Sequence, residues 1–508
     1  MGDSWVSSAE RIGLDLHLEL PVTGGRRAAL TAALREAVRS GRLAPGTRLP
    51  PYRSLAADLG VARNTVADAY AELVAEGWLT ARQGSGTRVA ERAEPLRPAD
   101  PLRPAEPLRP AGRGPATAPP RTRGPRTPVS RRAPQSSPQP SPATSRHDFR
   151  QGIPDASAFP RAEWVASYRR ALQQAPSEVF GPGDPAGRVE LREALAEYLA
   201  RVRGVRTEPG RIVICSGFAH ALRLLFGGRE LRGPLAVEAY GLPFHRELLT
   251  AAGVRTVPLP LDEHGARVEQ LGRERAVLLT PAHQFPTGGP LHPERRGAVI
   301  DWARARGGLV LEDDYDGELR YDRKPVGAVQ GLDPERVILL GSVSKSLSPA
   351  VRLGWMVLPE RYVDGVLAVK GEREAWASVL DQLSLADFIS CGAYDRHVRR
   401  MRLRYRGRRD RLVAALAEHA PQVEVSGVAA GLHAVLRLPP GTERSTLNAA
   451  KRQGVALDGL AGFRHPETAM ESGDGLVVGY ATPSEHAYGA ALEALCRALA
   501  SSGAGTEP

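Results

Sequence analysis

The sequence has little cysteine. Only three of its 508 residues are cysteines, and Cys215, Cys391 and Cys496 lie far apart in the chain. An odd number at such spacing gives no support for a disulfide framework or for a CxxC-type metal site. We therefore expect a protein without a bound metal, and a reducing compartment, the cytoplasm, is the simplest interpretation.

Long apolar stretches are also missing. No apolar run approaches the roughly 18 residues that a membrane span needs. The first twenty residues have neither a basic start nor the apolar core of a secretory signal. We expect no membrane partner and no secretion.

Apolar residues become scarce over 91–146, a stretch that holds 15 of the 43 prolines and a repeated six-residue AEPLRP-like unit. Such a stretch cannot offset the entropy of ordering, which predicts a disordered, extended Pro/Arg-rich linker. It carries 11 arginines against 4 acids, or +7 of the total net charge of +11. This excess either keeps the linker solvated or holds DNA phosphates non-specifically near the folded part.

The linker divides the chain into a domain at 1–90 and a larger one at 147–508. In the first, Leu30, Leu34 and Val38 repeat at helical spacing within 24–40. A short helix that Ser54 can cap follows and stops at Gly60. A further helix over 63–77 and two short β runs about a QGSG turn complete the outline of a winged helix-turn-helix. The alternative is a small helical protein-interaction domain.

Across residues 24–90 the sequence resembles the DNA-binding domain of GntR regulators. The segment that carries this resemblance is RLPPYRSLAADLGVARNTVADAYAELVAEGWLTARQGSGTRV. The resemblance implies that ten residues face operator DNA. They are Arg53, Arg63, Asn64, Thr65 and, in the wing, Arg82, Gln83, Gly84, Ser85, Gly86 and Thr87. One departure is Ala62, which stands where the family usually has a helix-capping Ser; such a loss costs on the order of 1 kcal/mol.

In the larger domain, short apolar runs alternate with amphipathic helical stretches. The runs are RIVIC (211–215), PLAVE (234–238), RAVLLT (275–280), GGLVLEDD (307–314) and RVILLGS (336–342). This alternation predicts a largely parallel α/β sheet, whose ligands sit at the carboxyl ends of the strands.

Candidate chemical groups fall at those strand ends. In GSVSKSLSPAVRLGW (341–355), Lys345 follows a strand, with Ser342 and Ser344 before it and Arg352 after it. A lysine beside hydroxyls and a guanidinium suits an aldehyde cofactor that carries a phosphate. By itself the motif could also be an exposed loop lysine.

Two further segments support the first interpretation. VLEDDYDGELRY (310–321) ends a strand in acids and a tyrosine, which can hold a ring nitrogen and a ring hydroxyl, although Asp313, Asp314 and Asp316 could also bind a metal. VICSGFAHALRLL (213–225) predicts a strand, a Ser-Gly turn and a helix, whose first N–H groups can hold a phosphate. An ordinary strand-to-helix turn is the alternative there.

Together the four segments SGFAHAL, TPAHQFPTGG, LEDDYDGELRY and GSVSKSLSPAVRLGW resemble fold-type I aminotransferases. More narrowly, the chain resembles the MocR-type branch of GntR regulators, which includes regulators of pyridoxine synthesis. The implied fold is an α+β winged helix-turn-helix domain followed by an α/β fold-type I PLP-dependent transferase domain, with a smaller C-terminal α+β subdomain at about 395–508. In this branch the cofactor is pyridoxal 5'-phosphate (PLP).

The resemblance implies roles for individual residues. Lys345 is the Schiff-base lysine, Asp313 (or, one residue on, Asp314) meets the pyridine nitrogen and Tyr315 meets the ring hydroxyl. The phosphate falls to Ser216, Gly217, Phe218, Ala219, Ser342, Ser344 and Arg352.

Some positions depart from the family. Pro182 stands where a tyrosine would reach the cofactor phosphate of a partner subunit. Leu242 aligns with the aromatic residue that stacks on the ring, unless Tyr240 or Phe244 substitutes. Val477 or Val478 stands where aminotransferases place the arginine that grips the α-carboxylate, and Arg464 is the candidate to compensate.

These losses concern substrate binding, whereas the lysine and the ring-nitrogen acid remain. We therefore expect a homodimeric, operator-binding transcription regulator that binds PLP through Lys345 and responds to PLP or a PLP–amine adduct. An active aminotransferase fused to a DNA-binding domain is the first alternative. A dimerising domain that has lost its cofactor is the second.

Overall fold

A computed structural model describes most of the chain outside the predicted linker. The residues described are 26–39, 43, 46–82, 86–90, 145–181, 183–228, 231–321, 326–371, 377–471 and 473–503. The predicted linker lies outside them as far as residue 144. None of the helices in this part of the chain is long and apolar enough to cross a membrane.

The N-terminal part is a winged helix-turn-helix, as predicted. It comprises α2 (Arg26–Arg39), α3 (Tyr52–Asp58), α4 (Arg63–Ala75) and the antiparallel wing strands β1 (Leu79–Arg82) and β2 (Gly86–Val89). Leu30, Leu34, Val66 and Leu73 are fully buried in its core, so the helical spacing of the sequence does mark the inner faces.

The predicted start of the short helix is wrong. We expected Ser54 to cap it, but α3 begins at Tyr52, and the N–H of Leu55 donates to the carbonyl of Pro51 at 3.1 Å. Proline is well tolerated at a helix start, because it has no backbone N–H that would be left unpaired there. The helix therefore begins directly after the Pro50–Pro51 pair, two residues before Ser54. Its end agrees with the prediction, because Gly60 takes a left-handed φ of 61°.

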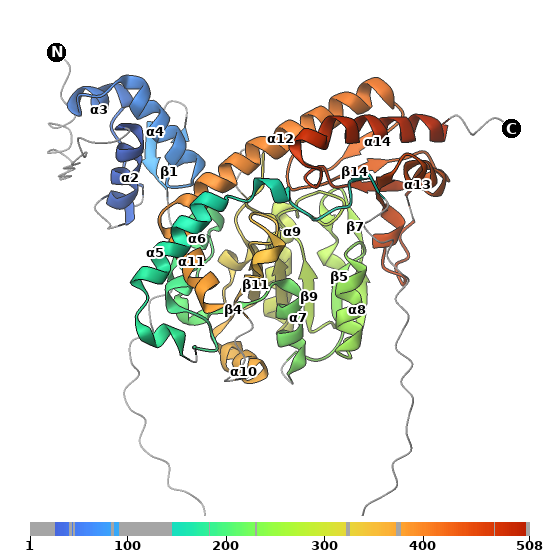
Figure 1. Ribbon diagram of the computed structural model, residues 1–508. Coiled ribbons are helices and arrows are strands. Elements are labelled where there is room, and N and C mark those ends of the chain that lie inside the picture. Colours follow the sequence, from blue (N-terminus) through green and yellow to red (C-terminus); the bar gives the residue numbers. More distant parts are fainter. Residues whose placement is uncertain are drawn as a thin grey trace, which may run out of the picture.

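A seven-stranded sheet forms the centre of the larger domain (Figure 1). Its strands are β4 (Ile212–Cys215), β5 (Leu235–Glu238), β6 (Thr256–Leu259), β9 (Ala276–Leu279), β10 (Leu309–Asp313), β11 (Val337–Ser342) and β12 (Gly354–Val357). The order is β4-β12-β11-β10-β9-β5-β6, and β12 is antiparallel to both its neighbours. The other pairs are parallel, and each of the five apolar runs contains one strand.

Helices cover both faces of this sheet because its strands are apolar on both sides. Ile212 and Ile214 pack with helices α6 (Val189–Arg203) and α11 (Val379–Ser390), whereas Val213 and Cys215 pack with α7 (Phe218–Gly227) on the opposite face. The described part of this domain also contains the α-helices α5 (Arg161–Gln174), α8 (Pro243–Ala251), α9 (Pro293–Arg306) and α10 (Glu360–Lys370). A small hairpin, β7 (Leu261–Asp262) and β8 (Gly265–Ala266), completes it.

The C-terminal subdomain is α+β, as the resemblance implies. It holds α12 (Ala393–His419), β13 (Glu424–Ser426), β14 (Ala434–Arg437), α13 (Glu443–Arg452), β15 (Val455–Ala456), β16 (Asp458–Gly459), β17 (Gly475–Val478) and α14 (Tyr488–Gly503). The sheet order is β13-β14-β17-β16, and all its pairs are antiparallel.

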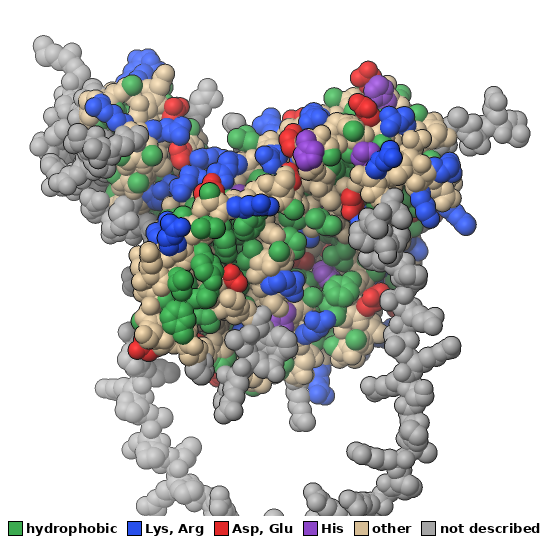
Figure 2. Space-filling model, in the orientation of Figure 1, with side chains coloured by type: hydrophobic (Ala, Val, Ile, Leu, Met, Phe, Trp, Pro, Cys, Tyr) green, Lys and Arg blue, Asp and Glu red, His purple; other side chains and the backbone are tan. Residues whose placement is uncertain are grey.

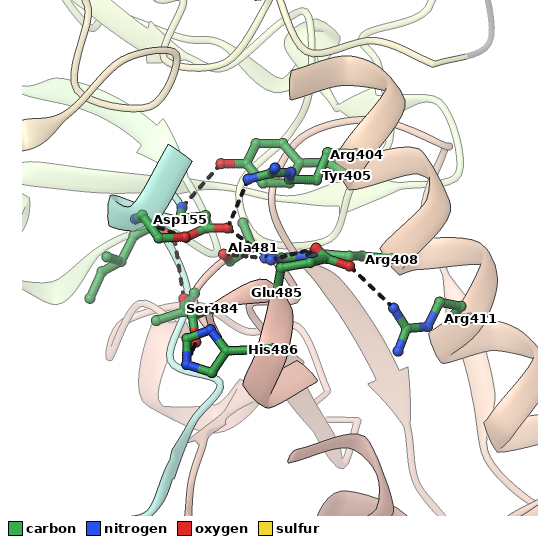
Figure 3. A network of polar contacts seen from close by, with 12 residues as sticks. Asp155, Arg404, Tyr405, Arg408, Arg411, Ala481, Ser484, Glu485 and His486 are labelled. Atoms are coloured by element: carbon green, nitrogen blue, oxygen red, sulfur yellow. Dashed lines mark hydrogen bonds and ion pairs between the residues drawn. The ribbon is translucent and has the colours of Figure 1, made fainter. Parts of the chain in front are cut away.

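The first strand of the larger domain belongs to this subdomain. β3 (His147–Asp148) pairs in parallel with β15, more than three hundred residues away, a connection that local sequence patterns do not indicate. The segment then continues toward the sheet as a strap over 149–160. Asp155 fixes the strap, because its carboxylate pairs with the fully buried Arg408 of α12 at 2.8 Å and with Arg404 at 3.2 Å (Figure 3).

Candidate cofactor pocket and nucleic-acid interface

A cavity of about 190 Å³ lies at the carboxyl ends of the central strands. The ten residues predicted to hold the cofactor come from three separate stretches of sequence, and all ten line it. They are Ser216, Gly217, Phe218, Ala219, Asp313, Tyr315, Ser342, Ser344, Lys345 and Arg352. The sheet brings them together because β4, β10 and β11 present their ends at the same edge.

The start of α7 forms one end of the cavity. Gly217 precedes the helix with a φ of 111°, a conformation that glycine adopts without strain. The backbone N–H of Ser216 donates to Nδ1 of His220 at 3.1 Å, and burial lowers the pKa of that histidine to about 4. The neutral ring of His220 therefore holds the turn in place. The backbone N–H groups of the residues directly after Ser216 remain available to bind an anion.

A second segment closes the same end. Ser342 ends β11 and Ser344 follows it, and the N–H of Ser344 lies 3.4 Å from the Ser342 hydroxyl. Arg352 has a left-handed backbone, with φ 55°, and among the described residues no other residue besides glycine has a positive φ. A non-glycine residue in this region carries a conformational cost of about 1–3 kcal/mol, and such positions cluster at ligand-binding sites.

Lys345 also lines the cavity. Its Nζ donates to the carbonyl oxygen of Gly152 at 2.5 Å, and burial lowers the pKa of the amine. Glycine suits position 152, because the backbone there has a φ of 81° and a Cβ would lie 2.9 Å from the present position of Nζ. The strap thus touches the lysine directly, and Gln151 and Gly152 are cavity residues that sequence reasoning missed.

The three acids after β10 have different surroundings. Asp314 accepts two hydrogen bonds of 2.7 Å from the buried guanidinium of Arg203, and Asp316 lies 2.8 Å from Nδ1 of His283. Asp313 alone of the three lines the cavity, where burial first and the neighbouring Asp314 second raise its pKa well above the usual value. A protonated ring nitrogen would supply the positive charge that this carboxyl lacks, so the geometry favours Asp313 over Asp314 as its partner.

Tyr315 is part of a buried network next to Asp313. Its hydroxyl lies 3.0 Å from Nδ1 of His283, the same atom that Asp316 contacts. Burial raises the pKa of Tyr315 well above its ordinary value. His283 therefore shares one ring nitrogen between a tyrosine and a carboxylate. The sequence signal for it was its place in TPAHQFPTGG, but no role was assigned to it.

Other wall residues were missed because they come from the helix after β5 and from the small subdomain. His245 packs on Phe218 with ring centroids 4.4 Å apart, and burial lowers its pKa to about 3. Arg246 donates to the carbonyls of Gly241, Phe463 and Arg464. His433 of the small subdomain also lines the cavity, as does Phe285 of the TPAHQFPTGG segment.

The departures from the aminotransferase pattern are placed as follows. Val477 is fully buried in a cluster with Tyr240, Phe285 and Phe463, whereas Val478 packs into the core of the small subdomain. Arg464 donates to the carbonyls of Thr468 and Met470 at 2.9 and 2.5 Å and does not line the cavity. Leu242 and Tyr240 line the cavity; Phe244 does not and is half exposed, and Pro182 lies outside the described residues.

The predicted DNA-reading residues of the helices lie on one open surface. Arg53, Arg63 and Asn64 are exposed, Thr65 is half-buried, and the guanidinium of Arg63 lies 5.1 Å from the ring centre of Tyr52. Ala62 precedes α4 without a side-chain hydrogen bond, so the helix has no side-chain cap. In the wing, Arg82 ends β1, and Gly86 and Thr87 begin β2; Gln83, Gly84 and Ser85 lie outside the described residues.

Comparisons with known proteins agree with this division. Residues 27–89 match the family "Bacterial regulatory proteins, gntR family", and residues 154–468 match "Aminotransferase class I and II". The kynurenine aminotransferase of Pyrococcus horikoshii superposes with a TM-score of 0.64 at 23% identity, over 71% of this chain and 91% of that one. Fold and site thus define a DNA-binding winged helix fused to an aminotransferase-like domain.

Similarity along the whole chain narrows the class. The probable rhizopine catabolism regulatory protein MocR of Rhizobium meliloti is 34% identical, with 88% of each chain covered. The pyridoxine biosynthesis transcriptional regulator PdxR of Corynebacterium glutamicum is 30% identical, over 90% of this chain and 92% of that protein. The chain belongs to the MocR-type GntR regulators and is a transcriptional regulator with an aminotransferase-like domain.

Proposed function

We propose that this regulator binds PLP covalently through Lys345 and senses it, or an amine adduct of it, to control binding at an operator. The observation that carries the proposal is that Lys345 and Asp313 line the same cavity. Asp314 and Asp316 are already held by Arg203 and His283, which leaves Asp313 for a cationic ring nitrogen.

The residues of the cavity fit this cofactor in three ways. The lowered pKa of Lys345 favours the neutral amine that attacks an aldehyde. The start of α7, the two serines and Arg352 offer N–H, O–H and guanidinium donors to a phosphate. When bound, the cofactor would supply an electron-withdrawing ring, and Asp313 would hold that ring protonated.

Sensing is favoured over transamination by the apolar wall. In an aminotransferase a guanidinium grips the α-carboxylate, and the resemblance puts Val477 or Val478 at that place. Val477 packs in a cluster with Phe285 and Phe463, and Arg464 is occupied by two carbonyls. Without that grip an amino acid would lack its bidentate anchor, while Lys345, Asp313 and Arg352 would still be available to the cofactor.

The winged helix supplies the DNA-binding half of the proposal. Arg63 and Asn64 at the exposed start of α4 are positioned to enter a major groove. Exposed apolar residues on the α5 side of the molecule, including Val165, Leu172 and Phe180, support a homodimer. A twofold dimer would then recognise two half-sites.

The test is an absorbance titration of the full-length protein with PLP. Lys345→Met should abolish the visible band of the lysine–cofactor adduct, and Asp313→Asn should weaken cofactor binding at least about tenfold, because it removes a charge-assisted contact. The control is Lys370→Met. Lys370 is also buried, and burial lowers its pKa too, but its Nζ donates to the carbonyl of Ile214 at 2.7 Å and does not face the cavity.

Borohydride reduction followed by peptide mapping identifies the lysine that carries the cofactor. Label on Lys345 supports the proposal, and label on Lys370 or Lys451 contradicts it. Conversion of a panel of amino acids into keto acids by the wild-type protein would instead establish an active aminotransferase.

A further inference from the structure

The winged-helix domain rests on the aminotransferase-like domain through a compact set of charged groups. The contact lies between the end of α4 on one side and helices α6 and α12 on the other. In Figure 2 arginines gather where the two parts of the molecule meet. Glu72 and Glu76 come from the winged helix, and Arg201, Arg399 and Arg402 come from the larger domain.

Arg201 of α6 lies at the centre of this contact. Its guanidinium donates to the backbone carbonyl of Glu76 and pairs with Asp395 of α12 at 2.7 Å. It also stacks over Trp78, 4.3 Å from the ring centre, and lies 5.3 Å from that of Tyr198. The side chains of Arg201 and Asp395 are only 4% and 7% exposed, so the pair is shielded from water by the docked domain.

The surrounding residues make the contact close and complementary. Glu76 pairs with Arg35 of its own domain at 2.7 Å and lies 3.8 Å from Arg399, which also reaches Glu72 at 3.2 Å. Gly77 allows the close approach, because it has a φ of 79° and a Cβ there would lie 3.3 Å from the carbonyl of Arg201. Two acids of the winged helix thus meet Arg399, while the backbone carbonyl of Glu76 meets Arg201.

The DNA-reading surface stays open in this docked arrangement. The contact uses the last turn of α4, whereas Arg63 and Asn64 lie exposed in its first turn. Docking therefore sets the direction in which the reading helix points. It does not cover that helix.

The same contact is connected to the cofactor pocket through the first turns of α12. Ser346, the residue after Lys345, is buried; its hydroxyl lies 2.6 Å from that of Tyr394, and its carbonyl accepts from His397 at 2.9 Å. Tyr394 precedes Asp395, and its ring lies 5.2 Å from that of Tyr198, one turn before Arg201 on α6. Ser346 alone thus separates Lys345 from α12, the helix whose Asp395 pairs with Arg201.

We infer that Arg201 and its neighbours on α6 and α12 form a docking surface for the winged helix of the same chain, and that Ser346 and Tyr394 couple this surface to the state of Lys345. The second half rests on the proposed function; the first does not. Docking onto a rigid body would fix the separation of two reading helices in a dimer. Coupling to Lys345 would then make operator affinity depend on the cofactor.

Docking is tested on the cofactor-free, full-length protein by hydrogen–deuterium exchange. Arg201→Ala should raise exchange at amides 73–79 about tenfold or more, because it leaves Asp395 buried without its partner. The matched control is Arg192→Ala, another arginine of α6, whose partner Asp184 is half exposed and remote from the winged helix. Equal protection of 73–79 in the wild type and both variants would overturn the docking surface. Asp395→Asn provides a milder second variant should Arg201→Ala fail to fold.

Coupling is tested by operator affinity with and without PLP, on an operator selected with the wild-type protein. Tyr394→Phe keeps the ring contact but removes the hydroxyl, so exchange at 73–79 should stay low while the effect of PLP on affinity disappears. Arg201→Ala should lose both. An unchanged PLP effect in both variants overturns the coupling. A wild-type protein that gives no cofactor band overturns the proposed function and the coupling together, while the exchange result still decides the docking.

Discussion

At the scale of single residues, neighbouring side chains of one type have different chemistry because different elements meet them. Asp313 and Asp314 are adjacent in sequence, yet one faces the cavity and the other is held by Arg203 at 2.7 Å. Alternation along an extended strand end sends consecutive side chains to opposite sides, so an error of one residue would exchange a ligand with a structural ion pair.

His433 shows what burial does to a titrating group on the cavity wall. Its Nε2 lies 3.1 Å from the carbonyl of Pro286, and burial lowers its pKa to about 3. The unfolded chain takes up a proton near pH 6.5, whereas the folded protein does not. The stability contributed by the neutral ring is thus complete above about pH 6.5 and is lost as the pH falls toward about 3.

We therefore expect His433→Gln to lose less stability on acidification than the wild type. Between pH 7 and pH 5 the difference should be about 2 kcal/mol, measured by denaturant unfolding at each pH. His419→Gln, at the exposed end of α12, is the control. Parallel pH profiles for the wild type and His433→Gln would contradict the argument.

At the scale of elements, α4 combines a well-formed inner face with an unfinished start. Val66 and Leu73 are fully buried, but Ala62 offers no side-chain acceptor to the first N–H groups of the helix. Those N–H groups have no side-chain acceptor, so the helix is less stable by on the order of 1 kcal/mol than it would be with a serine cap. The helix is nevertheless retained, because packing of its apolar face outweighs a single cap.

Ala62→Ser should stabilise α4 by about 0.5–1 kcal/mol. The measurement is native-state hydrogen exchange at the amides of α4 in the full-length protein. Ala71→Ser is the matched control: the same substitution at an exposed position inside the helix should destabilise it by a few tenths of a kcal/mol. If both substitutions change exchange in the same direction, the missing cap does not limit the helix.

At the scale of the whole molecule, the strap and α12 join regions that are distant in the chain. Asp155 in the strap, Arg408 in α12 and Glu485 before α14 form one network (Figure 3). Its centre is dry, since the side chains of Asp155 and Arg408 are each 1% exposed. The strap directly follows strand β3, and it contains Gly152, whose carbonyl accepts the hydrogen bond from Lys345.

Asp155→Asn should destabilise the protein by about 1–3 kcal/mol, because the buried Arg408 would keep only the half-exposed Glu485 as a carboxylate partner. Denaturant unfolding measures the loss, and hydrogen exchange should rise together in 147–160 and 479–486. Asp410→Asn is the control, since its pair with Arg406 is exposed and worth less than about 1 kcal/mol. Equal losses for the two variants would show that the network does not hold the strap.

What the sequence determined by itself was local and repeated. The apolar runs predicted five of the seven strands of the central sheet, helical spacing predicted the inner face of α2, and the sequence motifs identified ten of the residues that line the cavity. Such features depend on neighbours within a few residues, where the period of the backbone is visible.

Only the tertiary structure decided the rest. It distinguished Asp313 from Asp314, which pairs with Arg203, and it brought the carbonyl of Gly152 to Lys345. It also paired β3 with β15 of the C-terminal subdomain and brought Arg201 into contact with the winged helix. Each of these contacts joins residues more than a hundred positions apart. In most of them, the role of one residue cannot be predicted until the position of its partner is known. A local pattern carries no record of such pairs, because their free energy appears only when distant elements pack.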